Sequence, residues 1–263
     1  MIPLETIILG FVQGVTEWIP VSSTGHLRIT EYFLGLELPL FFDLILHIGT
    51  LIVTLFFFRT DIKKIICSIY NWELETEYGK MVPLIIIGSI PIAIVGLLFN
   101  NFVDLYFNDI LPIAIAYIFC GLMLYFSKNG IGEKNKLGYF EALQIGIAQG
   151  IAIIPGISRS GFTIAVALLL GIKQEISFKF SFLLSIPAII GGFTYTFISQ
   201  REALNLAGLD LIKIFVGIIV TIIIGYFSLT ILKKSLAAKK FYLFAFYCWF
   251  LSIILILLTI IGF

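Results

Sequence analysis

Six segments of this chain are apolar and long enough for a helix to cross a lipid bilayer, which requires roughly 20 residues. They cover residues 40–58, 81–99, 110–127, 178–198, 210–232 and 241–263. Because hydrocarbon offers no partner for unpaired backbone groups, each segment should be helical. Apolar residues make up 60% of the 263 positions and charged residues only 13%, which excludes an ordinary water-soluble domain. The sequence therefore predicts an all-α, polytopic membrane protein with a single membrane domain over residues 1–263.

Two further apolar segments, residues 2–20 and 139–154, have a different pattern. Each ends in a break rich in Pro, Gly and Ser that carries polar groups, and then resumes as a shorter apolar piece up to Gly35 or Gly171. This pattern is typical of two half-helices that enter the membrane and turn back, with the broken backbone buried in protein. We predict one such re-entrant helix pair at the start of each half of the chain.

The two halves are related by a constant offset of 136 residues without a gap. Matched pairs at this offset include Glu5 with Glu141, Gln13 with Gln149, Ser22 with Ser158, and Gly25 with Gly161. Polar matches are rare in so apolar a chain, so they indicate a duplicated unit. Repeat 1 covers about 1–127 and repeat 2 about 139–263.

The charges of the loops indicate how the halves are oriented. Residues 59–80 contain four Lys or Arg, residues 128–138 three and residues 233–240 four, whereas 100–109 contains none and 199–209 one. This alternation places the rich loops in the cytoplasm. Each half then comprises a re-entrant pair plus three spans. Because three is odd, we predict an inverted repeat whose two breaks meet from opposite faces near the middle. We also expect a short amphipathic helix at the start of 59–80.

The first break begins with Gln13 and Glu17, which lie one helical turn apart and share a face. A carboxylate beside an amide oxygen can hold a hard cation, Mg²⁺ or Ca²⁺, to which a diphosphate would supply further oxygens. Alternatively, Glu17 only balances the charge of Arg159. The two interpretations are compatible, so Glu17 and Gln13 are candidate ligands of a divalent metal.

The break continues with Ser22, Ser23 and Thr24, followed by Gly25 and His26. Hydroxyl groups within reach of an imidazole allow a serine nucleophile that His26 activates, or His26 itself as nucleophile or general acid. Ser22 could instead be only the N-cap of the next half-helix, a position at which serine is strongly favoured.

The second break contains Arg159, and an arginine at membrane depth costs at least about 2.5 to 3.5 kcal/mol. Its planar fork suits a phosphate, and the backbone amides at the start of the following half-helix favour an anion. Small and hydroxyl residues surround it: Gly156, Ser158, Ser160, Gly161 and Thr163. The alternative is an arginine that pairs with an acid and locks the two repeats together.

Other residues in the spans have more modest interpretations. Asp43 and His47 lie four apart on one face, where they could relay protons, but we favour a self-satisfied hydrogen-bonded pair near the membrane surface. Several residues of the later spans indicate close helix contacts or kinks, namely Gly88, Pro91, Gly96, Gly191 and Gly192.

Taken together, an arginine, a carboxylate, hydroxyls and a histidine on broken helices favour phosphoryl transfer from a lipid phosphate or diphosphate. The alternative is a transporter or flippase for a phosphorylated lipid or another anion, because inverted repeats with broken helices are typical of alternating access. A site that only binds would not need His26. No basic stretch of the kind that nucleic-acid binding requires is present, so we expect no nucleic-acid partner.

Three stretches carry a family resemblance: Gln13 followed by Glu17, the run Pro-Val-Ser-Ser-Thr-Gly-His at 20–26, and Pro-Gly-Ile-Ser-Arg-Ser-Gly-Phe-Thr at 155–163. They resemble the signature segments of the integral-membrane undecaprenyl-diphosphate phosphatases associated with bacitracin resistance, and the similarity extends over essentially the whole chain. The resemblance implies hydrolysis of undecaprenyl diphosphate to undecaprenyl phosphate and inorganic phosphate, which recycles the lipid carrier for cell-wall synthesis. The family allows Glu or Gln at the first acidic position, and this chain has Gln13.

The resemblance also implies roles for individual residues. Glu17 with Gln13 would bind metal and diphosphate, and Ser23 or His26 would attack or transfer a proton. Arg159 with Ser158 and Ser160 would clamp the phosphates. We expect the catalytic residues Glu17, Ser23, His26 and Arg159 to line one cavity, with substrate bound by Gln13, Ser22, Thr24, Gly25, Gly156, Ser158, Ser160 and Thr163. The protein is expected in the plasma membrane, with its site reached from the extracytoplasmic side. A homodimer is a candidate assembly.

Overall fold

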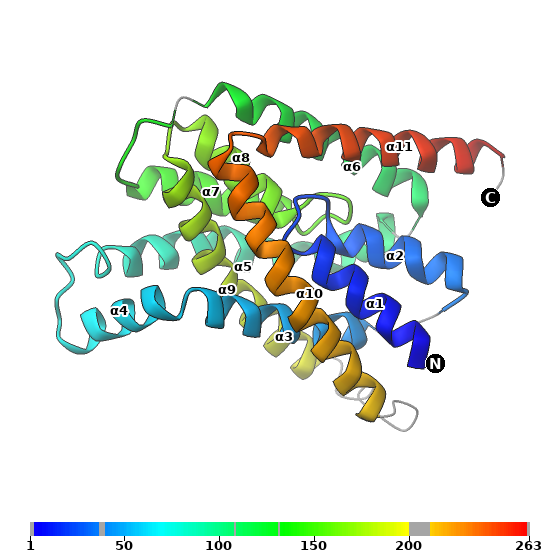
Figure 1. Ribbon diagram of the computed structural model, residues 1–263, viewed down its shortest axis with the longest axis horizontal. Coiled ribbons are helices and arrows are strands. Elements are labelled where there is room, and N and C mark those ends of the chain that lie inside the picture. Colours follow the sequence, from blue (N-terminus) through cyan, green and yellow to red (C-terminus); the bar gives the residue numbers. More distant parts are fainter. Residues whose placement is uncertain (1–2, 37–39, 108, 131, 200–210, 262–263) are drawn as a thin grey trace.

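The computed structural model describes residues 3–36, 40–107, 109–130, 132–199 and 211–261, and nearly all of them are helical (Figure 1). The two short 3₁₀ turns are η1 (Ser127–Asn129) and η2 (Phe241–Leu243). The α-helices are α1 (Pro3–Thr16), α2 (Ser23–Leu34), α3 (Leu40–Phe57), α4 (Arg59–Tyr70), α5 (Met81–Tyr106), α6 (Ile110–Phe126), α7 (Tyr139–Ile151), α8 (Arg159–Leu169), α9 (Gln174–Ser199), α10 (Leu211–Ala237) and α11 (Phe244–Ile261).

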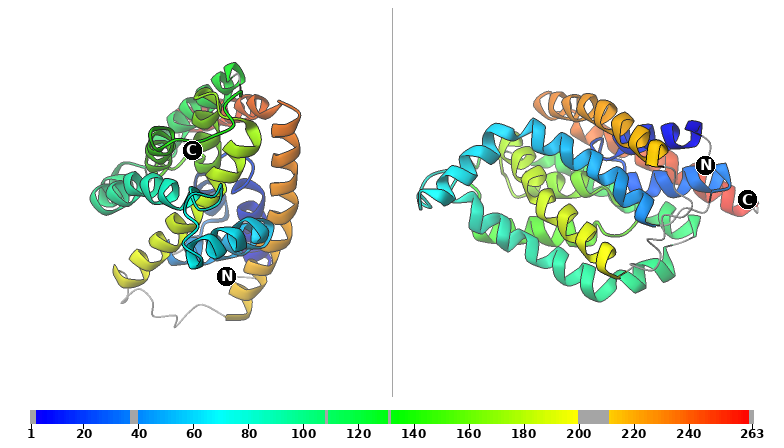
Figure 2. Two further views of the ribbon diagram at one scale, coloured as in Figure 1. Left: turned by 90° about the vertical axis from the view of Figure 1, so that its left-hand side faces the viewer. Right: turned by 90° about the horizontal axis from the view of Figure 1, so that it is seen from below.

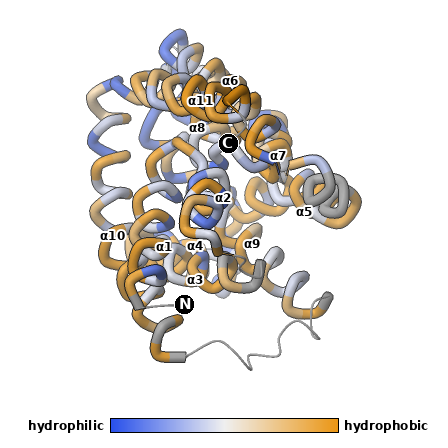
Figure 3. Tube along the Cα trace, turned by 90° about the vertical axis from the view of Figure 1, so that its right-hand side faces the viewer, coloured by the Kyte–Doolittle hydropathy of each residue, from blue (hydrophilic) through white to orange (hydrophobic). Residues whose placement is uncertain are grey.

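Among the described residues, five helices are long and apolar enough to cross a membrane: α5, α6, α9, α10 and α11. A sixth is counted when α3 and α4, which are bent by 76° at Phe58, are taken as one span. The six predicted apolar segments are therefore helical wherever the structure describes them, and the expected short helix at the start of 59–80 is α4. Many large apolar side chains of these helices are exposed, as a surface that faces lipid requires. Figure 3 shows that hydrophobic residues predominate along the helices.

Both predicted helix-break-helix hairpins are present, as α1 with α2 and as α7 with α8. Ser22 caps α2 by accepting a hydrogen bond from the Gly25 N–H at 3.4 Å, and Ser158 caps α8 by accepting one from the Gly161 N–H at 3.1 Å. The hairpins enter from opposite sides of the molecule and their breaks lie together at its centre (Figure 1). The expectation that the two breaks meet is thus confirmed.

Each hairpin packs against a span from the other half of the chain. Helix α1 lies along α10, and α7 lies along α5. Glycines make both crossings close, because a Cβ at Gly10 would collide with the Gly217 carbonyl and a Cβ at Gly146 with the Gly88 carbonyl. This exchange of partners is what an inverted repeat requires, although the two-fold relation itself stays a prediction.

Gly88 is therefore at a close helix contact, as predicted, but three other glycines are not. At Gly96, Gly191 and Gly192 no heavy atom lies within 4 Å of where a Cβ would stand. For these three the predicted helix contact is wrong, because they line an open cavity between α5 and α9.

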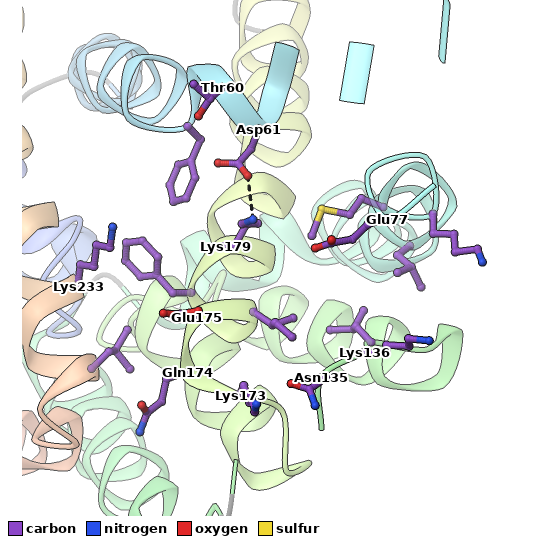
Figure 4. A pocket seen from close by; sticks show the side chains of 18 of the residues that line it. Thr60, Asp61, Glu77, Asn135, Lys136, Lys173, Gln174, Glu175, Lys179 and Lys233 are labelled. Atoms are coloured by element: carbon purple, nitrogen blue, oxygen red, sulfur yellow. Dashed lines mark ion pairs between the residues drawn. The ribbon is translucent and has the colours of Figure 1, made fainter. Parts of the chain in front are cut away.

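The lysine-rich loops gather at one end of the molecule, on the left in Figure 1, and the left view of Figure 2 looks onto that end. They surround a cavity of about 1140 Å³ (Figure 4). Its charges are largely balanced within the protein: Lys179 contacts Asp61 at 2.8 Å and Lys80 contacts Glu75 at 3.0 Å. The clustering agrees with the alternation of loop charges in the sequence.

Candidate active site

Glu17 is the centre of the site and is buried in the break between α1 and α2. Its Oε1 accepts a hydrogen bond from the guanidinium of Arg159, at the start of α8. Its Oε2 accepts one from the hydroxyl of Ser23 at 2.6 Å and one from the Nε2 amide of Gln13 at 3.1 Å. The Nε2 of His47 lies 3.4 Å from the same oxygen. Both oxygens of the carboxylate are thus held by polar partners.

Direct hydrogen bonds join the two breaks. The Gly156 N–H donates to the hydroxyl of Ser22 at 3.0 Å, and the Ser160 hydroxyl donates to the Glu17 carbonyl at 3.3 Å. The contact leaves no room for a larger residue at Gly161, where a Cβ would stand 2.9 Å from the Pro20 side chain. The site is therefore built from both halves of the chain and requires both hairpins to be formed.

A cavity of about 570 Å³ opens at this junction and extends between α5 and α9. Its polar lining comprises Thr16, Glu17, Ser22, Ser23, Thr24, His47, Ser89, Gln149, Ser158, Arg159, Tyr195 and Thr196. The remaining lining is mostly apolar, with open glycines on both α5 and α9. A polar end joined to an apolar groove suits an amphipathic ligand with an anionic head.

The ion pair between Arg159 and Glu17 bears on both of the interpretations given for Arg159 in the sequence analysis. It links α8 to the first hairpin, and breaking a buried pair by removing one partner commonly costs about 3 to 5 kcal/mol. The Arg159 side chain is nevertheless 20% exposed and lines the cavity, so its other N–H groups can meet a ligand anion. Locking the repeats and binding an anion are thus compatible in this geometry.

His26 does not line this cavity, and the expectation that it would is wrong. Its Nδ1 lies 2.8 Å from both the Ser22 carbonyl and the Tyr117 hydroxyl, and its Nε2 lies 2.7 Å from the Tyr247 hydroxyl. Tyr117 comes from α6 and Tyr247 from α11, so the ring is held between the breaks and these two helices. The imidazole forms hydrogen bonds with these two tyrosines, and the spacing of residues within the motif could not predict them.

The expected substrate-binding residues fall into two groups. Ser22, Thr24 and Ser158 line the cavity. The others do not line the cavity. Two of them contact residues of the site: the Thr163 hydroxyl donates to the Arg159 carbonyl at 2.8 Å, and Gly25 leaves room for the Tyr117 side chain. Those not lining it are Gln13, Gly25, Gly156, Ser160 and Thr163.

His47 and Gln149 are among the polar cavity residues that the sequence analysis did not assign to the site; the others are Thr16, Ser89, Tyr195 and Thr196. His47 was expected to pair with Asp43, whose side chain lies outside the described residues. The only sequence signal for His47 is that the chain has just two histidines. For Gln149 the signal is its match to Gln13 at the offset between the halves.

The site offers few protein groups that could bind a metal ion. The part of the chain that the structure describes contains no cluster of three or more His, Cys, Asp or Glu that could hold one. Gln13 does present a buried Oε1 without a hydrogen-bond partner among the described residues, close to the Glu17 carboxylate. Carboxylate and amide oxygens are of the kind that a hard cation prefers, but only Glu17 of the two lines the cavity, so a ligand would have to supply most of the other oxygens.

Comparison with known proteins agrees with this chemistry. Residues 6–254 match the profile of a family described as bacitracin resistance protein BacA. The chain is 39% identical to the undecaprenyl-diphosphatase of Carboxydothermus hydrogenoformans over 98% of each sequence. It is 37% identical to that of Methanosphaera stadtmanae, again over 98% of each, and 35% identical to that of Methanobrevibacter smithii over 95% of each.

Proposed function

The chain belongs to the bacitracin resistance protein family, and from this premise we propose that it hydrolyses undecaprenyl diphosphate to undecaprenyl phosphate and inorganic phosphate. The reaction recycles the lipid carrier for cell-wall synthesis and confers resistance to bacitracin. The three relatives named above are called undecaprenyl-diphosphatases, and each is similar to this chain over nearly its whole length. The observation that carries the proposal is the Ser23 hydroxyl held 2.6 Å from a buried carboxylate that also contacts an arginine.

In this mechanism Ser23 is the nucleophile and Glu17 its general base. The O–H bond of Ser23 breaks, Glu17 takes the proton, and the serine oxygen bonds to the terminal phosphorus of the substrate. The bond from that phosphorus to the bridging oxygen breaks, and undecaprenyl phosphate leaves. Water then attacks the phosphorus of the phosphoserine, and the bond from phosphorus to the serine oxygen breaks. The serine oxygen takes back the proton held by Glu17, and inorganic phosphate leaves with the oxygen and protons of the water. His47, beside Glu17, helps to hold the carboxylate in position.

Arg159 stabilises the charge that develops during this transfer. Phosphoryl transfer spreads negative charge over the equatorial oxygens, and a fixed guanidinium stabilises that charge more than the ground state. The ion pair with Glu17 keeps the guanidinium in place before substrate binds, which reduces the reorganisation needed. Ser22, Thr24 and Ser158 offer hydroxyl groups to the same diphosphate from the cavity wall.

The residues around Glu17 would accept a divalent cation, Mg²⁺ or Ca²⁺, only together with the diphosphate, because the described residues offer no cluster of three or more ligands for it. When bound, such an ion neutralises phosphate charge. Glu17, which lines the cavity, would contact such an ion. The Oε1 of Gln13 is buried without a partner among the described residues but does not line the cavity, so it would contact the ion only after its side chain turns toward the cavity.

The site is reached from the extracytoplasmic side of the plasma membrane. The cavity is lined by the later parts of α5 and α9, such as Leu97 and Tyr195, and both helices run away from the lysine-rich end. By the charge rule that end faces the cytoplasm. Sedimentation in detergent would measure whether the protein forms a homodimer.

Release of phosphate from undecaprenyl diphosphate by the purified protein in detergent tests the function. We expect release that is lost with a chelator and restored by added Mg²⁺ or Ca²⁺, together with incorporation of radiolabelled phosphate into the wild type but not into Ser23→Ala. Movement of intact substrate across a vesicle membrane without phosphate release would contradict the proposal in favour of a flippase.

A further inference from the structure

Gln149 is a buried cavity residue that the mechanism above does not use. It lies near the end of α7, is 1% exposed and lines the same cavity as Glu17 and Arg159. Neither its Oε1 nor its Nε2 has a hydrogen-bond partner among the described residues. An amide in this state is unusual, since native proteins pair the large majority of their buried polar side-chain atoms.

Packing alone gives no reason for a glutamine at this position. A buried amide without partners lowers stability, whereas an apolar side chain of similar shape would be neutral or better. The neighbouring residues of α7, Ala148 and Gly150, are small and uncharged. An amide that persists where the fold does not need it points to a partner that comes from outside the protein.

Comparison with the first hairpin indicates the charge of that partner. Gln13 occupies the matching position, and its amide donates to Glu17 at 3.1 Å. The residue that matches Glu17 in the second hairpin is Ile153, which also lines the cavity. The second glutamine therefore has the same position but no carboxylate, and its N–H groups are available to an anion in the cavity.

We propose that Gln149 is a further substrate-binding residue, whose amide donates hydrogen bonds to oxygens of the substrate diphosphate. This assignment rests on the function proposed above. In the first hairpin a glutamine orients the protein's own carboxylate, and in the second the equivalent glutamine takes the substrate's anionic oxygens instead. With Arg159, Gln149 would hold the diphosphate from the side of the second hairpin.

The test compares Gln149→Leu with Gln144→Leu, the same change on the same helix at a residue that does not line the cavity. For Gln149→Leu we expect kcat/KM for undecaprenyl diphosphate to fall about 10-fold to 100-fold, as for the loss of a hydrogen bond to a charged group. Its Tm should stay the same or rise, since no internal hydrogen bond is lost. Gln144→Leu should match the wild type in kcat/KM.

Gln149→Glu keeps the shape but adds a negative charge, so it should lower kcat/KM further than Gln149→Leu. Wild-type kcat/KM in Gln149→Leu would overturn the assignment, and so would a parallel loss of Tm and kcat/KM, which indicates a structural role. An inactive wild type would instead refute the proposed function. In that case, calorimetric titration with inorganic diphosphate tests Gln149 directly: equal affinity in wild type and Gln149→Leu would overturn its role.

Discussion

The two breaks at the centre of the molecule share a scaffold but carry different chemistry. Ser22 and Ser158 cap the following helices in the same way, each by accepting a hydrogen bond from a glycine three residues later. One residue beyond each cap the breaks differ, because the first has Ser23 and the second Arg159. The first supplies an acid and a hydroxyl, and the second supplies a cation.

This difference explains why the site needs both halves. A carboxylate buried alone would be costly, and so would a buried guanidinium. In the folded chain Glu17 and Arg159 pair with each other across the junction of the breaks. Hydrogen bonds from Gly156 to Ser22 and from Ser160 to the Glu17 carbonyl also join the breaks, and the residues that differ between the breaks carry the proposed chemistry.

Ser23→Ala should have the largest effect, because it removes the proposed nucleophile, which lies in the first break. We expect kcat for phosphate release to fall by at least about 1000-fold, as for other nucleophile deletions. Thr24→Ala is the control, since it removes a neighbouring cavity hydroxyl and should cost far less. If Ser23→Ala kept more than a tenth of the wild-type kcat, attack by water would replace the serine mechanism.

Arg159→Lys should have the next largest effect, on the second break. The change keeps the charge but loses the planar fork. Loss of one such electrostatic donor commonly costs about 100-fold to 1000-fold in turnover, so we expect kcat to fall strongly and KM to change little. Steady-state kinetics in detergent measure both. A normal kcat with a raised KM would mean that Arg159 only anchors substrate, which would favour the transporter alternative.

The main features of this comparison could be predicted from the sequence. The offset between the halves located both hairpins, and the loop charges implied that their breaks would meet. These predictions succeed because periodicity and charge in a membrane chain report directly on what can face lipid. The pairing of Glu17 with Arg159 was one of the alternatives considered, since each charge needs a partner.

The surroundings of the two histidines could not be predicted. His26 lies within the motif but contacts tyrosines from α6 and α11, far along the chain. His47 lies outside both breaks, yet α3 brings it to Glu17. Local spacing does not specify which side of a short helix faces a distant neighbour. That choice depends on packing among helices that are remote in sequence.

Alanine at each histidine should distinguish an effect on catalysis, expected for His47, from an effect on stability, expected for His26. For His47→Ala we expect kcat to fall about 10-fold, which corresponds to about one hydrogen bond at the carboxylate. His26→Ala should instead lower Tm, because its ring contacts two tyrosine hydroxyls and the Ser22 carbonyl. Kinetics and thermal unfolding on both variants measure this. If His26→Ala lowered kcat more than His47→Ala did and left Tm unchanged, the result would favour the catalytic role of His26 that its motif suggests.

Alanine at the two capping serines should have the smallest effect and tests whether the scaffolds are equivalent. Loss of a serine N-cap costs about 1 kcal/mol of unfolding free energy, so Ser158→Ala should cost about that much. Ser22→Ala should cost about 1 kcal/mol more, because the Ser22 hydroxyl also accepts the Gly156 N–H across the junction. Unfolding in mixed detergent micelles measures both differences. Gly156 lies in the second break, so equal costs for the two variants would show that its hydrogen bond to Ser22 contributes nothing. The breaks would then be held together by the Arg159 and Glu17 pair and by the hydrogen bond from Ser160 to the Glu17 carbonyl.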